Sequence, residues 1–93
     1  MRILGSIDHP KWKITVFKME DRLTAKLESA LYELAFKFRA GEGMDSLEEV
    51  RHFMDAVFFE EAERQFEALH QARLRAFSRR SALSADESFE EII

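Results

Sequence analysis

Three stretches of the sequence decide the fold: ITVF at residues 14–17, LTAKLE at 23–28 and YELAFKFR at 32–39. In each stretch one set of alternate positions is apolar, which is the pattern of a β-strand with one buried face. Turn-forming residues interrupt the pattern at Glu20–Asp21 and at Ser29–Ala30. Because these connections are short, the sequence predicts hairpins and therefore antiparallel strands.

The chain before these stretches favours a further edge strand at residues 2–7, with Gly5 as the position of a possible β-bulge. Pro10, in the segment Asp8-His9-Pro10, cannot donate a backbone hydrogen bond and so marks a strand boundary. A competing interpretation takes residues 23–38 as one amphipathic helix. We prefer strands, because a helix would place the alternating aromatic residues of 32–38 on opposite sides.

After residue 39 the apolar period changes to that of a helix. The segment 40–43 (AGEG) reads as a loop, and Ser46 followed by Glu49 fits a capping box. Two apolar stripes follow that do not share one helical face, which predicts a short helix from Leu47 to about Met54. Asp55 would then cap a longer helix ending near Arg80, although one smoothly curved helix is an alternative.

The sequence therefore predicts an α+β fold: an antiparallel three- or four-stranded meander, a short helix and a long C-terminal helix. Residues 1–80 would form a single domain, and residues 81–93 a flexible acidic tail that could also be a docking peptide. The predicted core consists of Ile14, Val16, Leu23, Leu27, Tyr32, Leu34, Phe36, Phe38, Val50, Met54, Phe58, Ala62 and Phe66.

Composition excludes several classes of function. The 93 residues include no cysteine, which removes disulfides, thiolate catalysis and cysteine-ligated metal centres. The longest apolar run, residues 56–59, is far shorter than the roughly 20 residues of a membrane span. A net charge of −4 argues against a dedicated duplex-DNA binder. We expect a soluble cytoplasmic protein with no membrane partner.

No motif identifies a catalytic or cofactor site, so we expect no enzymatic activity and no cofactor. Two Glu-x-x-His spacings occur, Glu49–His52 and Glu67–His70. Such pairs form part of di-iron sites in helical bundles, but here they would lie about 27 Å apart on a continuous helix. We interpret them as chance spacings in a Glu-rich helix, and the lone His9 as a structural turn residue.

The long helix supplies the main functional hypothesis. A helix over 55–80 would span roughly 37 Å, whereas seven-residue strands span only about 23 Å. Its apolar stripe would therefore outrun the sheet and need another cover, such as a second copy or a different protein. The candidate interface residues are Phe59, Phe66, Leu69 and Phe77.

A nucleic-acid-associated protein is the alternative hypothesis. The candidate anion contacts are Arg73, Arg75, Arg79 and Arg80 near the predicted helix end, where cations also simply favour the helix dipole. A second candidate surface is a basic and aromatic sheet face comprising Trp12, Phe17, Lys26, Lys37 and Arg39. Ordinary cross-strand ion pairing explains the charges of that face equally well.

Overall fold

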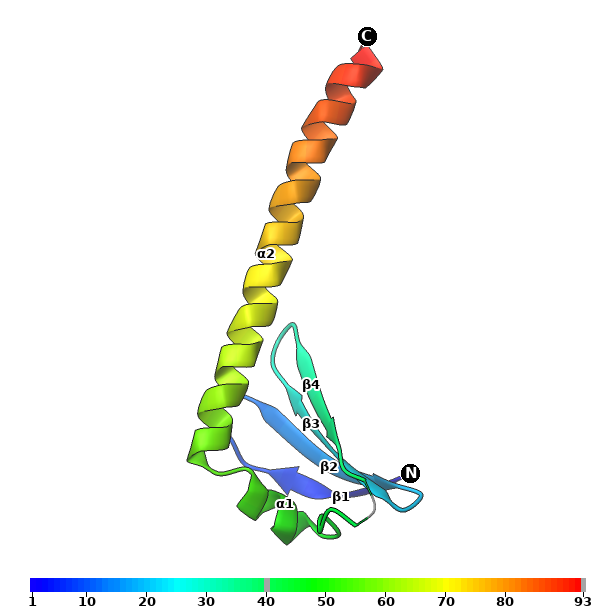
Figure 1. Cartoon of the computed structure of the whole chain (residues 1–93), viewed down its shortest axis with the longest axis vertical. Helices are drawn as coiled ribbons and strands as arrows, with labels where there is room; N and C mark the ends of the chain where they lie inside the picture. Colours follow the sequence, from blue (N-terminus) through cyan, green and yellow to red (C-terminus); the bar gives the residue numbers. More distant parts are fainter. Residues whose placement is uncertain (40, 93) are drawn as a thin grey trace. The chain divides into compact units, whose positions relative to one another are not determined.

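A computed structural model describes residues 1–39 and 41–92, with side chains described up to residue 82 (Figure 1). The element order is four strands followed by two helices, as the sequence predicts. The strands are β1 (Arg2–Ile7), β2 (Lys13–Met19), β3 (Arg22–Glu28) and β4 (Glu33–Lys37). They form one antiparallel sheet in the order β1-β2-β3-β4, so the helical alternative for 23–38 is wrong.

The two predicted turns have specific local structure. Glu20 and Asp21 connect β2 to β3, and Glu20 adopts φ 58°, in the left-handed region that non-glycine residues rarely occupy. Between β3 and β4, the Ser29 N–H donates to the Tyr32 carbonyl at 2.9 Å, and the Ser29 hydroxyl accepts from the Tyr32 N–H at 3.2 Å. The two Ser29–Tyr32 bonds close the β3–β4 hairpin.

The predicted bulge in β1 is confirmed. The register against β2 shifts between Ile3, which pairs with Phe17, and Gly5, which pairs with Val16. A Cβ at residue 5 would lie 2.7 Å from Leu47 Cδ2, so the absence of a side chain allows the close approach of the next helix.

The core face of the sheet carries the even-numbered positions of β2 and the odd-numbered positions of β3. Ile14, Val16 and Leu27 are at most 1% exposed. Trp12 lies before β2 in the same alternation and is also buried, so its assignment to the open basic face was wrong. The error is one of parity, since a residue two positions from Ile14 shares its face.

Helix α1 (Leu47–Phe53) begins at the predicted capping box. The Ser46 hydroxyl accepts from the Glu49 N–H at 3.3 Å and donates to Glu49 Oε1 at 3.1 Å, and that carboxylate also accepts from the Asp45 N–H at 3.3 Å. The predicted break follows at Met54. Asp55 then caps the second helix, because its Oδ1 accepts from the Phe58 N–H at 2.9 Å.

Helix α2 (Ala56–Ile92) is longer than predicted. The expected end near Arg80 was wrong, because the backbone stays helical through positions that the sequence reading assigned to a tail. Acidic and small residues such as Asp86 and Ala85 do not break a helix. The side chains of residues 83–93, most of the predicted acidic tail, lie outside the described residues.

The chain separates into two compact units, Met1–Ala62 and a second unit from Glu63 onward. In the first unit, aromatic rings fix the start of α2. The Phe58 ring lies 5.1 Å from Phe36 and 5.4 Å from Phe53, between ring centroids. These packed rings join the helices to the sheet.

Most of the predicted core is confirmed. Nine of its residues are buried, and Tyr32, Leu34, Phe36 and Phe58 are half-buried. Trp12 and Ala25 belong to the core as well. Among the described residues, no helix is both long and apolar enough to cross a membrane.

Candidate functional site

The apolar stripe of α2 has a covered part and an exposed part. At about 100° per residue, five apolar side chains of α2 project within about 60° of their common mean direction. They are Phe59, Ala62, Phe66, Leu69 and Phe77. Ala62 and Phe66 are 4% and 7% exposed, whereas Leu69 and Phe77 are 39% and 48% exposed. The stripe is therefore one helical face whose later half remains open to solvent in this chain.

Phe59 is engaged within the first unit. Its ring centroid lies 4.6 Å from that of His9 and 6.1 Å from that of Trp12. His9 in turn stacks on Trp12 at 4.4 Å with an interplanar angle of 4°, and its Nδ1 accepts from the Lys11 N–H. His9 thus serves the packing of this cluster, in which Phe59 is half-buried.

The exposed part of the stripe gains one residue that sequence reasoning missed. Leu74 is 47% exposed, about 80° around the helix from Phe66. We call residues 68–82 the exposed segment, since every described side chain in it except the half-buried His70 is exposed. Its large apolar side chains are Leu69, Leu74 and Phe77.

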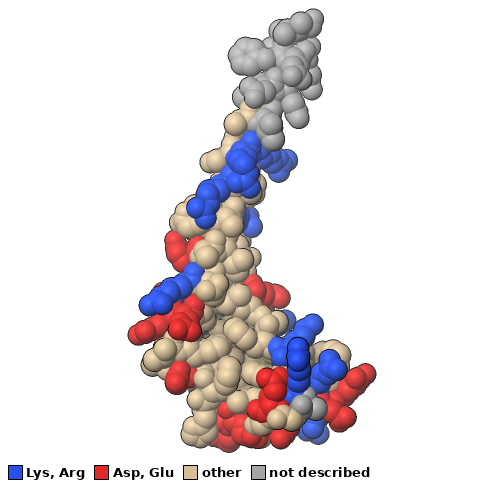
Figure 2. Space-filling view, viewed as in Figure 1, with Lys and Arg blue, Asp and Glu red and all other residues tan. Residues whose placement is uncertain are grey.

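The four candidate arginines lie within the exposed segment but not on one face. By the helical period, Arg73 and Arg80 fall on the side of the apolar stripe, and Arg75 and Arg79 fall on the opposite side. The Arg73 guanidinium lies 5.2 Å from the centroid of the Phe77 ring, which is a cation–π contact. Figure 2 shows a group of blue side chains on α2, with no red side chain among them on this face.

The exposed segment has one sign of charge. Residues 68–82 contain four arginines and no Asp or Glu. No acidic residue stands three or four positions from any of these arginines, which excludes the usual ion pairs within a helix. The segment is therefore both apolar and cationic.

The Glu-x-x-His pairs show no metal-binding arrangement. Glu49 belongs to the capping box of α1, and Glu67 accepts a hydrogen bond from Gln71 Nε2 at 2.9 Å. Within the described residues, no group of three or more His, Asp or Glu side chains could hold a metal ion.

The open face of the sheet carries a different set of residues from the one predicted. Phe17, Lys26 and Lys37 lie on it, but Trp12 belongs to the core, and Arg39 follows β4 in a turn where its N–H donates to Glu42 Oε1 at 2.6 Å. Lys26 is paired with Glu28 at 3.5 Å. Sequence reasoning missed that Met19, Arg22, Thr24 and Ala35 share a hollow with Phe17 and Lys37.

Comparisons of the chain with protein-family models, with curated proteins and with solved structures found no match.

Proposed function

We propose that this chain is a non-enzymatic interaction module that self-assembles through the exposed segment of α2. The observation that carries the proposal is the exposure of Leu74 and Phe77 on a helix whose earlier stripe residues, Ala62 and Phe66, are covered. A single helix without tertiary packing is only marginally stable in water. A cover for these side chains would stabilise both the helix and the complex.

The charge pattern of α2 favours a second copy in the antiparallel direction. Beyond the four arginines, the sequence of the helix carries Asp86, Glu87, Glu90 and Glu91. A parallel pair would set arginines against arginines. An antiparallel pair centred near residues 82–83 would set the basic block of each copy against the acidic block of the other. Such a twofold arrangement is self-complementary.

The helical period narrows the pairing to two positions in each block. Positions 87 and 91 fall on the same side of α2 as Arg73 and Arg80, whereas positions 86 and 90 fall away from it. The overlap would run from about residue 73 to residue 92, which is roughly 30 Å of helix. The arginines of the opposite side, Arg75 and Arg79, would stay outside the interface.

Light scattering after size exclusion tests the proposal. We expect a dimer that dissociates on dilution, with a dissociation constant on the order of micromolar for an interface this small. The Arg73→Glu/Arg80→Glu variant should be monomeric, and adding Glu87→Arg and Glu91→Arg to it should restore the dimer. The Arg75→Glu/Arg79→Glu variant is the matched control, with the same change of net charge, and should still dimerise.

A monomer at all concentrations would contradict self-assembly. A dimer that the control and the Arg73/Arg80 variant weaken equally would contradict the antiparallel pairing. The nucleic-acid alternative would instead give salt-dependent retention on immobilised single-stranded DNA or RNA, lost in all the arginine variants. The placement of the arginines on opposite sides of α2 supports the protein-interaction proposal over that alternative.

A further inference from the structure

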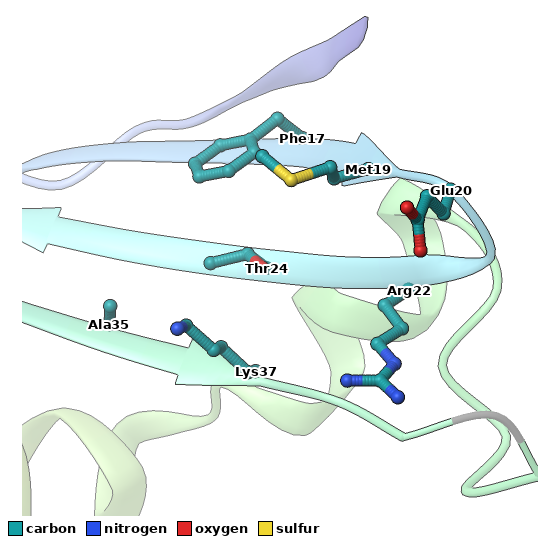
Figure 3. A pocket seen from close by; sticks show the side chains of 7 residues that line it. All are labelled: Phe17, Met19, Glu20, Arg22, Thr24, Ala35 and Lys37. Atoms are coloured by element: carbon teal, nitrogen blue, oxygen red, sulfur yellow. The ribbon is translucent and has the colours of Figure 1, made fainter. Parts of the chain in front are cut away.

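The open face of the sheet is hollowed at the end near the β2–β3 turn. The hollow has a volume of about 400 Å³, within the size range of small-molecule sites. Figure 3 shows its lining side chains along three neighbouring strands and the turn. They are Phe17, Met19, Glu20, Arg22, Thr24, Ala35 and Lys37.

Strand register builds the hollow. Phe17 pairs with Thr24, and Thr24 pairs with Lys37, so these three residues form one row across β2, β3 and β4. Met19 pairs with Arg22 in the neighbouring row on the same face. The lining is therefore held by backbone hydrogen bonds in three strands, which makes it a preformed surface.

The hollow combines an apolar wall with a polar floor. Phe17 is half-buried and Met19 is 50% exposed, so both offer apolar surface to a ligand. Thr24, between them and Lys37, is only 9% exposed although it lies on the open face. Among the described residues no hydrogen bond of its hydroxyl is present. A ligand that covers Phe17 could also bond to this hydroxyl.

Two cations, Arg22 and Lys37, line the hollow. Arg22 and Lys37 form no ion pair with any described residue, whereas Lys26, farther along the same face, is paired with Glu28. Glu20 also lines the hollow, which leaves the lining with one net positive charge. The uncompensated charge favours an anion beside the apolar wall.

We propose that this hollow binds a small organic anion, consisting of an apolar ring or chain with one terminal carboxylate. The apolar part lies against Phe17 and Met19, and the carboxylate lies between Arg22 and Lys37. A single-stranded nucleic acid fits less well, because it needs a continuous basic track with several stacking rings. Here Phe17 is the one aromatic residue of the lining, and Glu20, Glu28 and Glu33 interrupt the basic character of the face. This site is separate from the interface proposed on α2.

Titration of the full chain with 4-phenylbutyrate, followed by backbone amide NMR shifts, tests the site. We expect saturable binding with a dissociation constant on the order of millimolar for a ligand of this size. The shifts should centre on Phe17, Thr24 and Lys37. The amine of matched length, 4-phenylbutylamine, should bind at least about fivefold more weakly because its charge is repelled.

Variants separate the site from general charge effects. Arg22→Gln and Lys37→Gln should each weaken 4-phenylbutyrate binding about threefold to fivefold, the effect of losing one exposed ion pair. Glu20→Gln should strengthen binding, because it removes the repelling carboxylate. Lys13→Gln is the matched control, because it removes an exposed cation of β2 that does not line the hollow. It should leave 4-phenylbutyrate binding unchanged.

Several results would overturn the proposal. These are shifts that do not saturate or that lie outside the hollow, equal binding of the amine, and an effect of Lys13→Gln as large as that of Lys37→Gln. Binding of an oligothymidylate to the same amides more tightly than 4-phenylbutyrate would also overturn it, in favour of a nucleic-acid surface. Unchanged amide spectra of the unliganded variants would show that each variant is folded.

Discussion

Phenylalanine has two different roles in the two units of this chain. In the unit Met1–Ala62, Phe38 is 7% exposed, and the half-buried rings of Phe36 and Phe58 lie 5.1 Å apart, between centroids. In the unit from Glu63 onward, Phe77 is 48% exposed, and its one described ring contact is with the Arg73 guanidinium. Phe66, also in the second unit, is only 7% exposed, so the open apolar surface of that unit begins after Phe66.

The two units therefore differ in how much apolar surface their own contacts can bury. In the first unit the sheet packs against α1 and the start of α2, so each buried apolar residue has neighbours from several elements. A helix that continues alone can bury little more than its own backbone. The large apolar residues exposed there are the surface that the proposed self-assembly would cover.

The largest expected effect on the free energy of unfolding comes from a cavity-forming substitution in the core of the first unit. Leu27 is fully buried on β3, and Leu27→Ala should lower the free energy of unfolding by about 2–5 kcal/mol. Chemical denaturation followed by circular dichroism measures this loss. A loss below about 1 kcal/mol would mean that the sheet is not the cooperative core of the protein.

A matched pair of substitutions in one helix tests the comparison directly. Phe58→Leu should cost about 1–2 kcal/mol, because Phe58 packs edge-on against Phe36 and lies close to two further rings. Phe77→Leu should change the stability of the monomer by less than about 0.5 kcal/mol. Thermal melts at a concentration that keeps the chain monomeric measure both. Equal losses would show that Phe77 is packed within the monomer, contrary to its exposure.

A smaller effect than that of Phe58→Leu is expected at the start of α2. Asp55→Ala removes the side-chain acceptor of the Phe58 N–H and should cost about 1 kcal/mol. Asp55→Asn keeps an acceptor oxygen and is the control, with a loss of no more than a few tenths of a kcal/mol. Denaturation curves of the two variants decide the matter, and equal losses would show that the carboxylate acts through its charge alone.

The strands and helix starts could be predicted because each has a local cause. Alternation at residues 23–28 assigns Leu23 and Leu27 to one face whatever lies next to it. Ser46 and Asp55 indicate helix starts, because each side chain accepts a hydrogen bond from a backbone N–H three residues later. The end of α2 was misplaced because no residue between Arg80 and Ile92 is a helix breaker, and a change of composition alone does not end a helix.

The candidate sites could be predicted only in part. Of the four candidate interface residues, Leu69 and Phe77 are exposed and Phe59 is half-buried. Phe66 is buried, in agreement with its place in the predicted core. An apolar stripe identifies one side of a helix, but it does not show which of its residues other parts of the chain bury. Leu74 was missed because it stands at the margin of the stripe.

The sequence by itself determined the strand-then-helix order, the antiparallel sheet, the bulge at Gly5 and the break between α1 and α2. All of these depend on backbone preferences and on periods that operate within a few residues. Only the tertiary structure decided that Trp12 packs with His9 and Phe59, and that Arg22, Thr24 and Lys37 meet at one hollow. Those outcomes depend on the register between strands and on which elements cover each face, and residues distant in the chain acquire these relations only when it folds.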